Sequence, residues 1–304
     1  MTEVALIIGN GLDLDLGIKS SYRDFANSKE WKELMDGYRM SLIDVTSQNN
    51  SLLWQINLAS KDSQWFDIEE EIHKFINSHP NLTEHDIRHV ESEFKSIKKA
   101  LCKYLKRSAK DYKTDNKKIS RKLLYFLSDC PYNVYEFNFN YTNVNDFLGD
   151  SYRVLSTHIH GNLEDDDIVL GCDIQENEVV NRDLSFLYKY NMLNKANHIV
   201  ANMLAAKEVI IFGHSINEMD FCYFREYLKV ASSSSQQTRY LTIFTYDEQS
   251  ERDIKDNMRN QGISVSDIYN NLDGFTFIHT KNYYEGDKKE DNKLQDLVIR
   301  LQQR

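Results

Sequence analysis

The stretch Glu3-Val-Ala-Leu-Ile-Ile-Gly-Asn-Gly-Leu-Asp-Leu-Asp-Leu-Gly17 decides the fold. Its five consecutive apolar residues, Val4 to Ile8, are typical of a strand that is covered on both faces, as in a parallel sheet. They run into Gly9-Asn10-Gly11, and we expect a helix to start near Asp13. The stretch therefore predicts the strand–turn–helix unit that opens an α/β fold.

A glycine turn between a strand and a helix can bind an anion. The turn exposes backbone N–H groups, and the positive end of the helix dipole favours a nucleotide phosphate there. Leu14, however, stands where the ordinary dinucleotide fingerprint has its third glycine. Two interpretations stay open from these residues alone: a phosphate site, or a tight turn without a ligand.

Composition indicates a globular protein with a substantial core. The chain has 304 residues, 41% of them hydrophobic and 12% aromatic, and only 2 prolines and 11 glycines, which argues against long linkers. The net charge of −10 gives no overall attraction to nucleic acid or to an anionic membrane. No apolar run approaches the roughly 20 residues of a membrane span, and the N-terminus does not resemble a signal peptide.

The cysteines favour a reducing compartment. They are widely spaced and form no Cys-x-x-Cys pair, so neither disulfides nor a structural zinc module is expected. We therefore expect a cytoplasmic protein. The four are Cys102, Cys130, Cys172 and Cys222.

The order of the predicted elements indicates a parallel sheet with right-handed crossovers. Residues 51–129 read as mostly helical, including an amphipathic helix that Thr83 would cap, with Asp86 in the capping-box position. Strands are predicted at 4–8, 134–140, 153–160, 208–213, 240–245 and 275–279, and helices near 181–190, 195–206, 217–231, 248–260 and from about 290. We expect a Rossmann-like α/β core of residues 1–20 and 130–304, interrupted by a helical insertion of residues 21–129 that acts as a lid.

Polar residues follow three of the predicted strands, at the edge where ligands bind to open parallel sheets. They are Asn140 in Phe137-Asn-Phe-Asn-Tyr-Thr-Asn143, the histidines of His158-Ile-His-Gly-Asn162, and the segment Gly213-His-Ser-Ile-Asn217. Asn140 could orient a water or a ribose hydroxyl, or simply form a turn.

The two histidines of the second loop allow three interpretations. Two residues apart on a strand, His158 and His160 would face the same side. His160 could act as a catalytic base, the pair could bind a metal together with Asp173 or His214, or both could be structural.

Charged residues of the predicted insertion suggest two further possibilities. Asp67 and Glu69, in Trp65-Phe-Asp-Ile-Glu69, could reach the site or lie on a solvated helix face. The basic stretch 95–122 could bind nucleic acid, although Asp111 and Asp115 interrupt it and a solvated face is the commoner role of such a run.

Taken together and in this order, the motifs resemble the AbiH family of bacterial phage-defence (abortive infection) proteins. The resemblance extends from residue 4 to about residue 220. It rests on Gly9-Asn-Gly-Leu-Asp-Leu-Asp-Leu-Gly-Ile18 with Ser21-Tyr22 and Phe25, Trp65-x-Asp67-x-Glu69, Phe139-Asn-Tyr-Thr142, His158-Ile-His-Gly161 and Phe212-Gly-His-Ser215.

The order of motifs is also similar to the sirtuin-like NAD-binding fold. This resemblance implies that Gly9, Gly11 and Gly17 hold the pyrophosphate, and that Asn140 positions water or the nicotinamide ribose. It implies further that His160 is the catalytic histidine and that Gly213 and Ser215 contact the cofactor. The full expected NAD-contacting set is Gly9, Asn10, Gly11, Asp13, Gly17, Ser21, Gly213, His214 and Ser215.

The chain departs from sirtuins at several places. Asn10 replaces an alanine, Lys19 a proline and Thr142 an aspartate, and the four-cysteine zinc module is absent. Without that module, protein deacylation is not expected, and cleavage of NAD by water is favoured.

The resulting expectation is an abortive-infection NAD glycohydrolase that needs no metal. Its expected partners are NAD, a phage-derived trigger and other copies of the chain, but neither nucleic acid nor membrane. The alternatives are a nucleotide-binding sensor that catalyses nothing, and a metal-dependent nuclease that uses Asp67 and Glu69.

Overall fold

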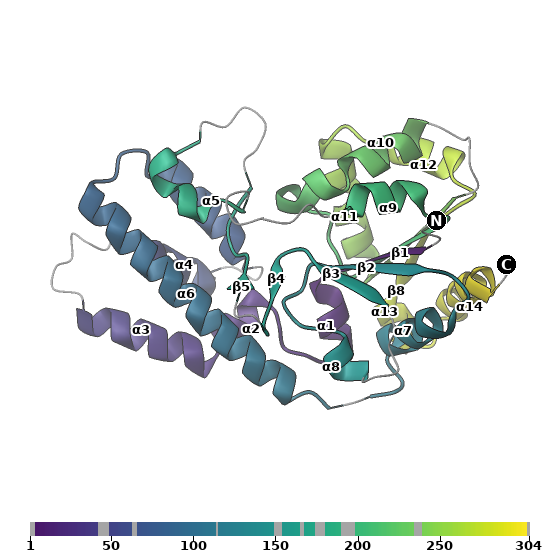
Figure 1. Ribbon diagram of the computed structural model, residues 1–304, viewed down its shortest axis with the longest axis horizontal. Coiled ribbons are helices and arrows are strands. Elements are labelled where there is room, and N and C mark those ends of the chain that lie inside the picture. The colour runs from purple at the N-terminus through teal and green to yellow at the C-terminus, as the bar shows by residue number, and fades with distance from the viewer. Residues whose placement is uncertain are drawn as a thin grey trace. The chain divides into compact units, whose positions relative to one another are not determined.

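The core of the protein is a six-stranded sheet in which every pair of neighbouring strands is parallel. The computed structural model describes residues 4–41, 49–62, 66–113, 115–148, 154–164, 167–173, 180–189, 198–233 and 239–302. The strand order is β3-β2-β1-β6-β7-β8 (Figure 1). The strands are β1 (Val4–Ile8), β2 (Val134–Asn138), β3 (Leu155–His158), β6 (Glu208–Phe212), β7 (Tyr240–Thr245) and β8 (Gly274–His279). The prediction of a Rossmann-like α/β fold is confirmed.

β1 lies at the centre because it can be buried on both sides. All five of its residues are buried, and it pairs in parallel with β2 on one side and with β6 on the other. The chain builds outward from β1 through β2 and β3, and then builds the other half from β6 through β7 to β8. The strand order therefore reverses at β1 and β6, the place where ligands bind to doubly wound sheets.

The chain divides into two compact units, each described here by itself. The first contains the sheet and comprises Met1–Gly17, Lys113–Ile159 and Ala196–Arg304. The second comprises Ile18–Tyr112 and His160–Lys195. In the described parts of both units, no helix is long and apolar enough to cross a membrane.

Helices cover both faces of the sheet in the first unit. In Figure 1, α9, α10, α11 and α12 lie on one side of the strands, and α1, α7, α13 and α14 on the other. The helices are α1 (Asn10–Leu16), α7 (Ile119–Asp129), α8 (Asn145–Leu148), α9 (Ile199–Ala205), α10 (Arg225–Ser233), α11 (Glu248–Asn260), α12 (Val265–Asn271), α13 (Thr280–Tyr284) and α14 (Lys288–Gln302), with a 3-10 helix η5 (Glu218–Tyr223).

The second unit is mainly helical. Its longest helix, α6 (Glu84–Lys110), begins with the predicted capping box, in which the Thr83 and Asp86 side chains each bond the other's backbone N–H. The other elements are α2 (Tyr22–Ala26), α3 (Lys29–Ser41), α4 (Leu52–Asp62), α5 (Ile68–Ser78), the 3-10 helix η3 (Arg182–Leu187) and the short antiparallel pair β4 (Gly161–Asn162) and β5 (Asp167–Ile168).

The observed division differs from the predicted one at both boundaries. Helix α7 was expected in the insertion but packs on α1 in the sheet unit. There Ser120 donates to Asp15 through both its N–H and its hydroxyl, and the N–H of Ile119 donates to the Tyr284 hydroxyl. Conversely, His160–Lys195 groups with the helical unit, where η3 contacts α6. Both departures come from contacts between distant parts of the chain.

Local element boundaries were predicted unevenly. β7 and α11 have the predicted bounds, whereas α1 starts at Asn10 rather than near Asp13. The helix predicted at 217–231 is a 3-10 helix followed by α10, and the segment near 181–190 is the 3-10 helix η3. Helices α12 and α13 were not predicted from the sequence. Trp65, in the predicted Trp65-x-Asp67-x-Glu69 motif, lies outside the described residues.

Candidate functional site

The turns that follow β1 and β6 are in direct backbone contact. A Cβ atom at Gly11 would lie 2.5 Å from the Cα of Gly213, and one at Gly213 would lie 2.4 Å from the Cα of Gly11. A Cβ at Gly9 would lie 2.6 Å from the Gly213 carbonyl oxygen. Glycine is therefore required at all three positions so that the two turns can meet, and Gly213 also has a φ of +65°.

This contact uses the N–H groups that were expected to bind phosphate. The N–H of Gly9 donates to the Phe212 carbonyl and that of Gly11 to the Gly213 carbonyl, both at 2.9 Å. Gly9, Gly11 and Gly213 thus serve the contact between the two turns, and their part in a pyrophosphate site stays a prediction. Glycine is needed in either case, because neither a second backbone nor a phosphate can approach closely at a position that carries a Cβ.

A buried carboxylate lies directly beyond this turn. Asp13, on α1, is 1% exposed and accepts hydrogen bonds from Asn140 Nδ2 at 3.0 Å and from Thr142 Oγ1 at 2.8 Å. Both donors come from the loop after β2. Asp13 therefore ties the loop after β2 to the helix after β1, and such charge-assisted bonds are about twice as strong as neutral ones.

The amide of Asn140 is fixed by two acceptors. Its Nδ2 atom donates to the Gly9 carbonyl at 3.0 Å as well as to Asp13, so both amide hydrogens are used. Among the described residues no donor lies at its Oδ1 atom, and the residue is 7% exposed. The acceptor Oδ1 is therefore the part of the Asn140 side chain that is left to meet a ligand.

Asn138, the last residue of β2, shapes the loop that carries Asn140. It is fully buried, accepts from the N–H of Asn140 at 2.8 Å and donates from Nδ2 to the Thr142 carbonyl at 3.0 Å. His158, at the end of β3, places Nδ1 3.1 Å from the Asn140 carbonyl. Asn138 and Thr142 were not predicted as site residues; the signal in the sequence is their alternation with Asn140 in Asn138-Phe-Asn-Tyr-Thr142.

The loop after β6 is strained and closed by a histidine. His214 accepts the Ile216 N–H at Nδ1 (2.9 Å), which leaves the ring proton on Nε2, 3.5 Å from the Asp220 carboxylate. The ring packs against Phe139 and Phe224, with centroid separations of 4.5 and 4.9 Å. Ile216 has a φ of +48°, a conformation that a β-branched residue rarely adopts. His214 thus holds the loop, because both of its ring nitrogens face protein groups.

The other predicted ligand residues of the glycine motif have structural positions. Gly17 ends α1 in the left-handed conformation with a φ of 97°, and its N–H bonds the Asp13 and Leu14 carbonyls. Ser21, in the second unit, caps α2 by accepting the Asp24 N–H at 3.0 Å. Asn10 and Ser215 are exposed.

His160 and His158 do not share a strand, so that prediction is wrong. β3 ends at His158, and the chain then passes into the second unit at His160. There the His160 carbonyl accepts the Val169 N–H at 2.7 Å, the side chain is 5% exposed, and the following Gly161 has a φ of 77°. The positive φ at Gly161 turns the chain into the β4–β5 pair.

Glu69 belongs to a buried ion pair. Its carboxylate lies 2.8 Å from Lys189 Nζ, and the two side chains are 9% and 2% exposed. Asp67 accepts the Glu69 N–H at 2.8 Å and caps α5. Within the described part of the chain, no three His, Cys, Asp or Glu side chains are grouped so that they could hold a metal ion. Asp67 thus caps α5, and Glu69 pairs with Lys189.

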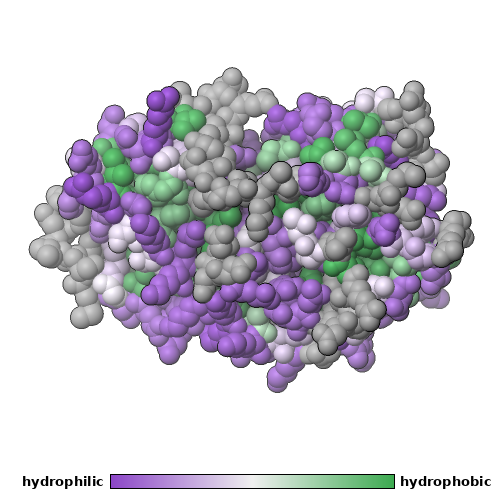
Figure 2. Space-filling model, viewed as in Figure 1, coloured by the Kyte–Doolittle hydropathy of each residue, from purple (hydrophilic) through white to green (hydrophobic). Residues whose placement is uncertain are grey.

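The basic stretch 95–122 is broken up by pairing. Arg107 binds Glu30 through two hydrogen bonds of 2.9 Å, Lys103 pairs with Glu33 and Lys95 with Glu91. Hydrophilic residues cover much of α6 on the face in Figure 2, as a solvated helix requires. The run is thus largely a solvated face, stabilised by ion pairs.

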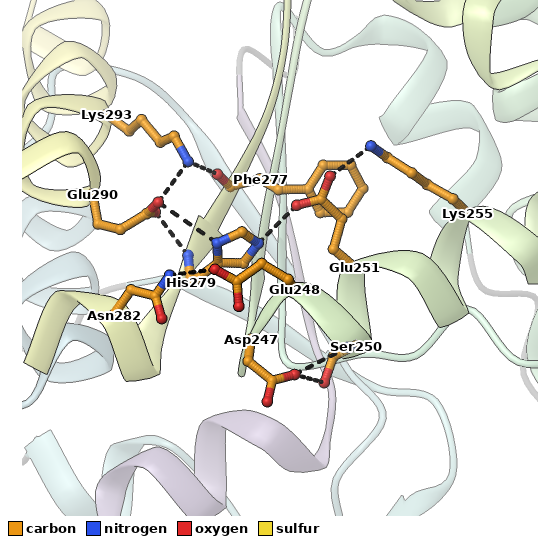
Figure 3. Close-up of polar contacts among 10 residues, drawn as sticks. All are labelled: Asp247, Glu248, Ser250, Glu251, Lys255, Phe277, His279, Asn282, Glu290 and Lys293. Atoms are coloured by element: carbon orange, nitrogen blue, oxygen red, sulfur yellow. Dashed lines mark hydrogen bonds and ion pairs between the residues drawn. The ribbon is translucent and has the colours of Figure 1, made fainter. Parts of the chain in front are cut away.

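A second polar cluster lies at the end of β8 (Figure 3). His279 Nε2 lies 2.7 Å from Glu251 on α11, and its backbone N–H donates to Glu290 on α14 at 2.8 Å. Lys255 and Lys293 neutralise the two carboxylates. Burial alone would raise the pKa of Glu251, but the hydrogen bonds from Lys255 and His279 outweigh it, and the net pKa is lowered. The cluster thus joins α11 and α14 to β8, the last strand. It was not predicted from the sequence.

Comparison of the sequence with known proteins shows the family to which the chain belongs. The model described as Bacteriophage abortive infection AbiH matches residues 5–244. No curated protein and no solved structure matches the chain. The matched range contains β1 with its glycine turn, the Asn138–Thr142 loop, and β6 with the His214 loop. Because it covers well over half of the residues, the chain belongs to the AbiH family of bacteriophage abortive infection proteins.

Proposed function

We propose that this protein cleaves the nicotinamide–ribose bond of NAD during phage infection, at the edge of the sheet formed by the ends of β1, β2 and β6. Three observations support the proposal. The family acts in abortive infection, the strand order reverses between β1 and β6, and polar side chains from both of those strand ends and from β2 gather there.

The observation that carries the proposal is the fixed amide of Asn140. With both amide hydrogens bonded to Gly9 and Asp13, the side chain can offer only its Oδ1 atom, which is an acceptor. An acceptor in a fixed position can bind one hydrogen of a water molecule and leave a lone pair of that water free for attack. It can equally accept a ribose hydroxyl, which would position the sugar.

The reaction needs positioning and electrostatic support more than acid catalysis. The bond between C1′ and the pyridine nitrogen breaks, its electrons return to nicotinamide, and nicotinamide leaves as a neutral molecule. Water forms the new bond to C1′ and releases one proton. The transition state is oxocarbenium-like, so a buried carboxylate close to it, here Asp13, would stabilise the developing positive charge.

The mode of phosphate binding differs from the sirtuin resemblance in this proposal. The N–H groups of Gly9 and Gly11 already donate to protein carbonyls, so the exposed polar residues Asn10 and Ser215 are the candidates to contact the diphosphate. The resemblance also implies that His160 removes a proton from water or from a ribose hydroxyl; His160 lies in the second unit, and this role rests on the resemblance alone.

A nucleotide-binding sensor without catalysis is the second candidate. It is favoured by the number of polar groups at this edge that are already paired within the protein, including Asp13, Asn138 and His214. Such a network would suit a rigid recognition surface. In both versions a phage-derived trigger and assembly of several copies would regulate the protein.

The test is the fate of NAD in the presence of the purified full-length chain. NAD is incubated with the protein, with and without lysate of phage-infected cells, and nicotinamide and ADP-ribose are measured by chromatography. We expect both products from wild type and a loss of at least 100-fold in rate in Asn140→Ala. Asn145→Ala is the matched control, because it makes the same change at an exposed asparagine on α8, close in sequence but outside the network at Asp13.

The outcomes separate the candidates. Binding of NAD or ADP-ribose without product would favour the sensor. If wild type neither binds nor consumes NAD under any of these conditions, both candidates are wrong. Equal rates in Asn140→Ala and Asn145→Ala would contradict the role given to Asn140.

A further inference from the structure

A pocket in the second unit contains buried donors that meet no acceptor among the described residues, and we propose that it binds a phosphorylated small molecule of about nucleoside monophosphate size. The pocket lies among α2, α3 and α4, and α2 contacts both of the other helices (Figure 1 labels all three). We call it the α2–α4 pocket. This ligand site goes beyond the reaction proposed for the sheet edge.

The first donor is the amide of Asn57 on α4. Asn57 is 4% exposed and lines the pocket, yet among the described residues its buried Nδ2 atom has no hydrogen-bond acceptor. A buried N–H₂ group without an acceptor loses its bonds to water and gains nothing in return, so native structures rarely retain one without a reason. A ligand that supplies an acceptor would remove that cost.

The second donor is the guanidinium of Arg23 on α2. Its Nη1 atom donates to the Ser60 carbonyl at 2.8 Å. The guanidinium carbon lies over the Phe66 ring, 5.9 Å from the ring centroid. These contacts hold the group in place. Its buried Nη2 atom meets no acceptor in the described part of the chain, and Arg23 also lines the pocket. An arginine with a free, fixed N–H₂ group suits an oxyanion.

The charge of the lining selects the same kind of ligand. Among the described lining residues are four cations, Arg23, Lys32, Arg39 and Lys61, and one carboxylate, Asp36, on a chain whose net charge is −10. Asp36 approaches Arg39 at 3.8 Å, and both side chains are more than half exposed, so this pair is weak. The lining thus concentrates positive charge on a negative protein, and an anion would be attracted to it.

Size and apolar lining indicate more than an inorganic ion. The volume of about 540 Å³ falls within the ~300–1,000 Å³ of ordinary small-molecule sites. Trp31 and Met35 add apolar surface to the lining. A phosphate group paired with a flat or apolar moiety, as in a nucleoside monophosphate, matches a lining that is cationic on one part and apolar on another.

A second pocket in the same unit supplies the contrast. It has about 370 Å³ and is lined by residues that include Ser51, Trp54, Gln55 and Glu71, with no cation among its described lining residues. Buried donors without acceptors, several cations and apolar side chains occur together only in the α2–α4 pocket, as far as the described pockets show. A generic surface hollow would not combine them.

The test is calorimetric titration of the full chain with AMP, inorganic phosphate and adenosine at low and high salt. We expect AMP to bind more tightly than either fragment, and binding to weaken as salt rises. Asn57→Leu and Arg23→Ala should each weaken AMP binding at least tenfold. Arg88→Ala is the charge-matched control; Arg88 lies on α6 and is paired with Glu84 at 3.5 Å, and its loss should leave binding unchanged.

Stability measurements separate a ligand site from a structural one. Asn57→Leu removes a donor that has no acceptor, so without ligand its midpoint of thermal unfolding should equal or exceed that of wild type. Asn57→Asp serves as a second variant, because it places a negative charge beside the phosphate and should abolish binding. The proposal is overturned if AMP does not bind wild type at millimolar concentration, if adenosine binds as well as AMP, or if AMP binds both Asn57 variants as tightly as wild type. NAD cleavage is measured on the same samples, and its presence or absence does not affect these outcomes.

Discussion

Buried polar side chains have hydrogen-bond partners at the edge of the sheet in the first unit. In the α2–α4 pocket of the second unit, two buried donors have none among the described residues. At the sheet edge the amide of Asn138 has partners at both its oxygen and its nitrogen, and Asp13 accepts from two side chains. In the pocket the amide nitrogen of Asn57 and one guanidinium nitrogen of Arg23 meet no acceptor among the described residues.

The difference indicates different kinds of function. A satisfied network holds a few atoms rigidly, which suits a reaction that depends on the placement of Asn140 Oδ1. Unsatisfied donors keep a free-energy cost that a ligand can remove, which suits binding and regulation. Comparable polar residues thus have opposite consequences for stability, and substitutions can test this directly.

We expect the largest loss of stability from a substitution that breaks the contact between the two glycine turns. Gly213→Ala should lower the free energy of unfolding by about 3–5 kcal/mol, because a Cβ there adds overlap with Gly11 to the cost of a positive φ. Gly17→Ala is the control, since Gly17 also has a positive φ but a Cβ would meet nothing within 4 Å, and it should lose only about 1–2 kcal/mol. Urea unfolding of both variants measures the difference; equal losses would contradict the contact.

The next prediction compares the two buried asparagines directly. Asn138→Leu should cost about 2–3 kcal/mol, because it leaves the Asn140 N–H and the Thr142 carbonyl without partners. The same change at Asn57 should cost nothing or stabilise by up to about 1 kcal/mol, because no partner among the described residues is lost. Thermal and urea unfolding of the two variants give the answer, and a similar loss in both would remove the distinction between edge and pocket.

A smaller effect depends on pH and concerns the bond between α3 and α6. The hydrogen bonds from Arg107 lower the pKa of Glu30 to about 2, from an ordinary value of 4.5. Because the folded pKa is the lower one, the stabilisation is complete above about pH 4.5 and is lost as the pH falls toward 2. Arg107→Gln should therefore reduce stability by about 1–2 kcal/mol at pH 7 and by progressively less in acid.

The control for the pH prediction is Arg88→Gln on the same helix, where the ion pair with Glu84 is exposed. Its unfolding midpoint should follow wild type at every pH. A gap between Arg107→Gln and wild type that stays constant down to pH 2 would contradict the role assigned to Glu30.

The smallest effect concerns the charged cluster at the end of β8. Glu251→Gln removes the carboxylate that binds both His279 and Lys255, and should cost about 1 kcal/mol because the group is partly exposed. Chemical denaturation measures this cost. The variant should retain wild-type AMP binding and NAD cleavage, and loss of either function with unchanged stability would show that the cluster has a further role.

Local patterns predicted much of the sheet and several helices. The apolar run Val4–Ile8, the capping residues Thr83 and Asp86, and the bounds of β7 and α11 all depend on residues that are neighbours in sequence. Each of these features is decided within about one helix or strand. The family, by contrast, followed from the order of motifs along most of the chain.

The parts that could not be predicted depend on long-range contacts. The segment Gly9-Asn10-Gly11 does not indicate whether it contacts the Gly213 turn or a phosphate, because either contact would require the glycines. The donors of the α2–α4 pocket, Arg23 and Asn57, lie 34 positions apart with no common motif, so only the folded unit brings them together. Likewise, α7 joins the sheet unit through bonds to Asp15 and Tyr284 that its own sequence does not indicate.

We have proposed that the sheet edge, with Asn140 fixed by Asp13 and Gly9, cleaves NAD on infection. Nucleotide profiling by mass spectrometry of phage-infected cells tests this proposal most directly, with cells that express wild type, Asn140→Ala, His160→Ala or the control Asn145→Ala at equal levels. We expect NAD to fall and ADP-ribose and nicotinamide to rise with wild type and with Asn145→Ala, but not with Asn140→Ala or His160→Ala. Abortive infection by wild type with NAD unchanged would contradict the proposal.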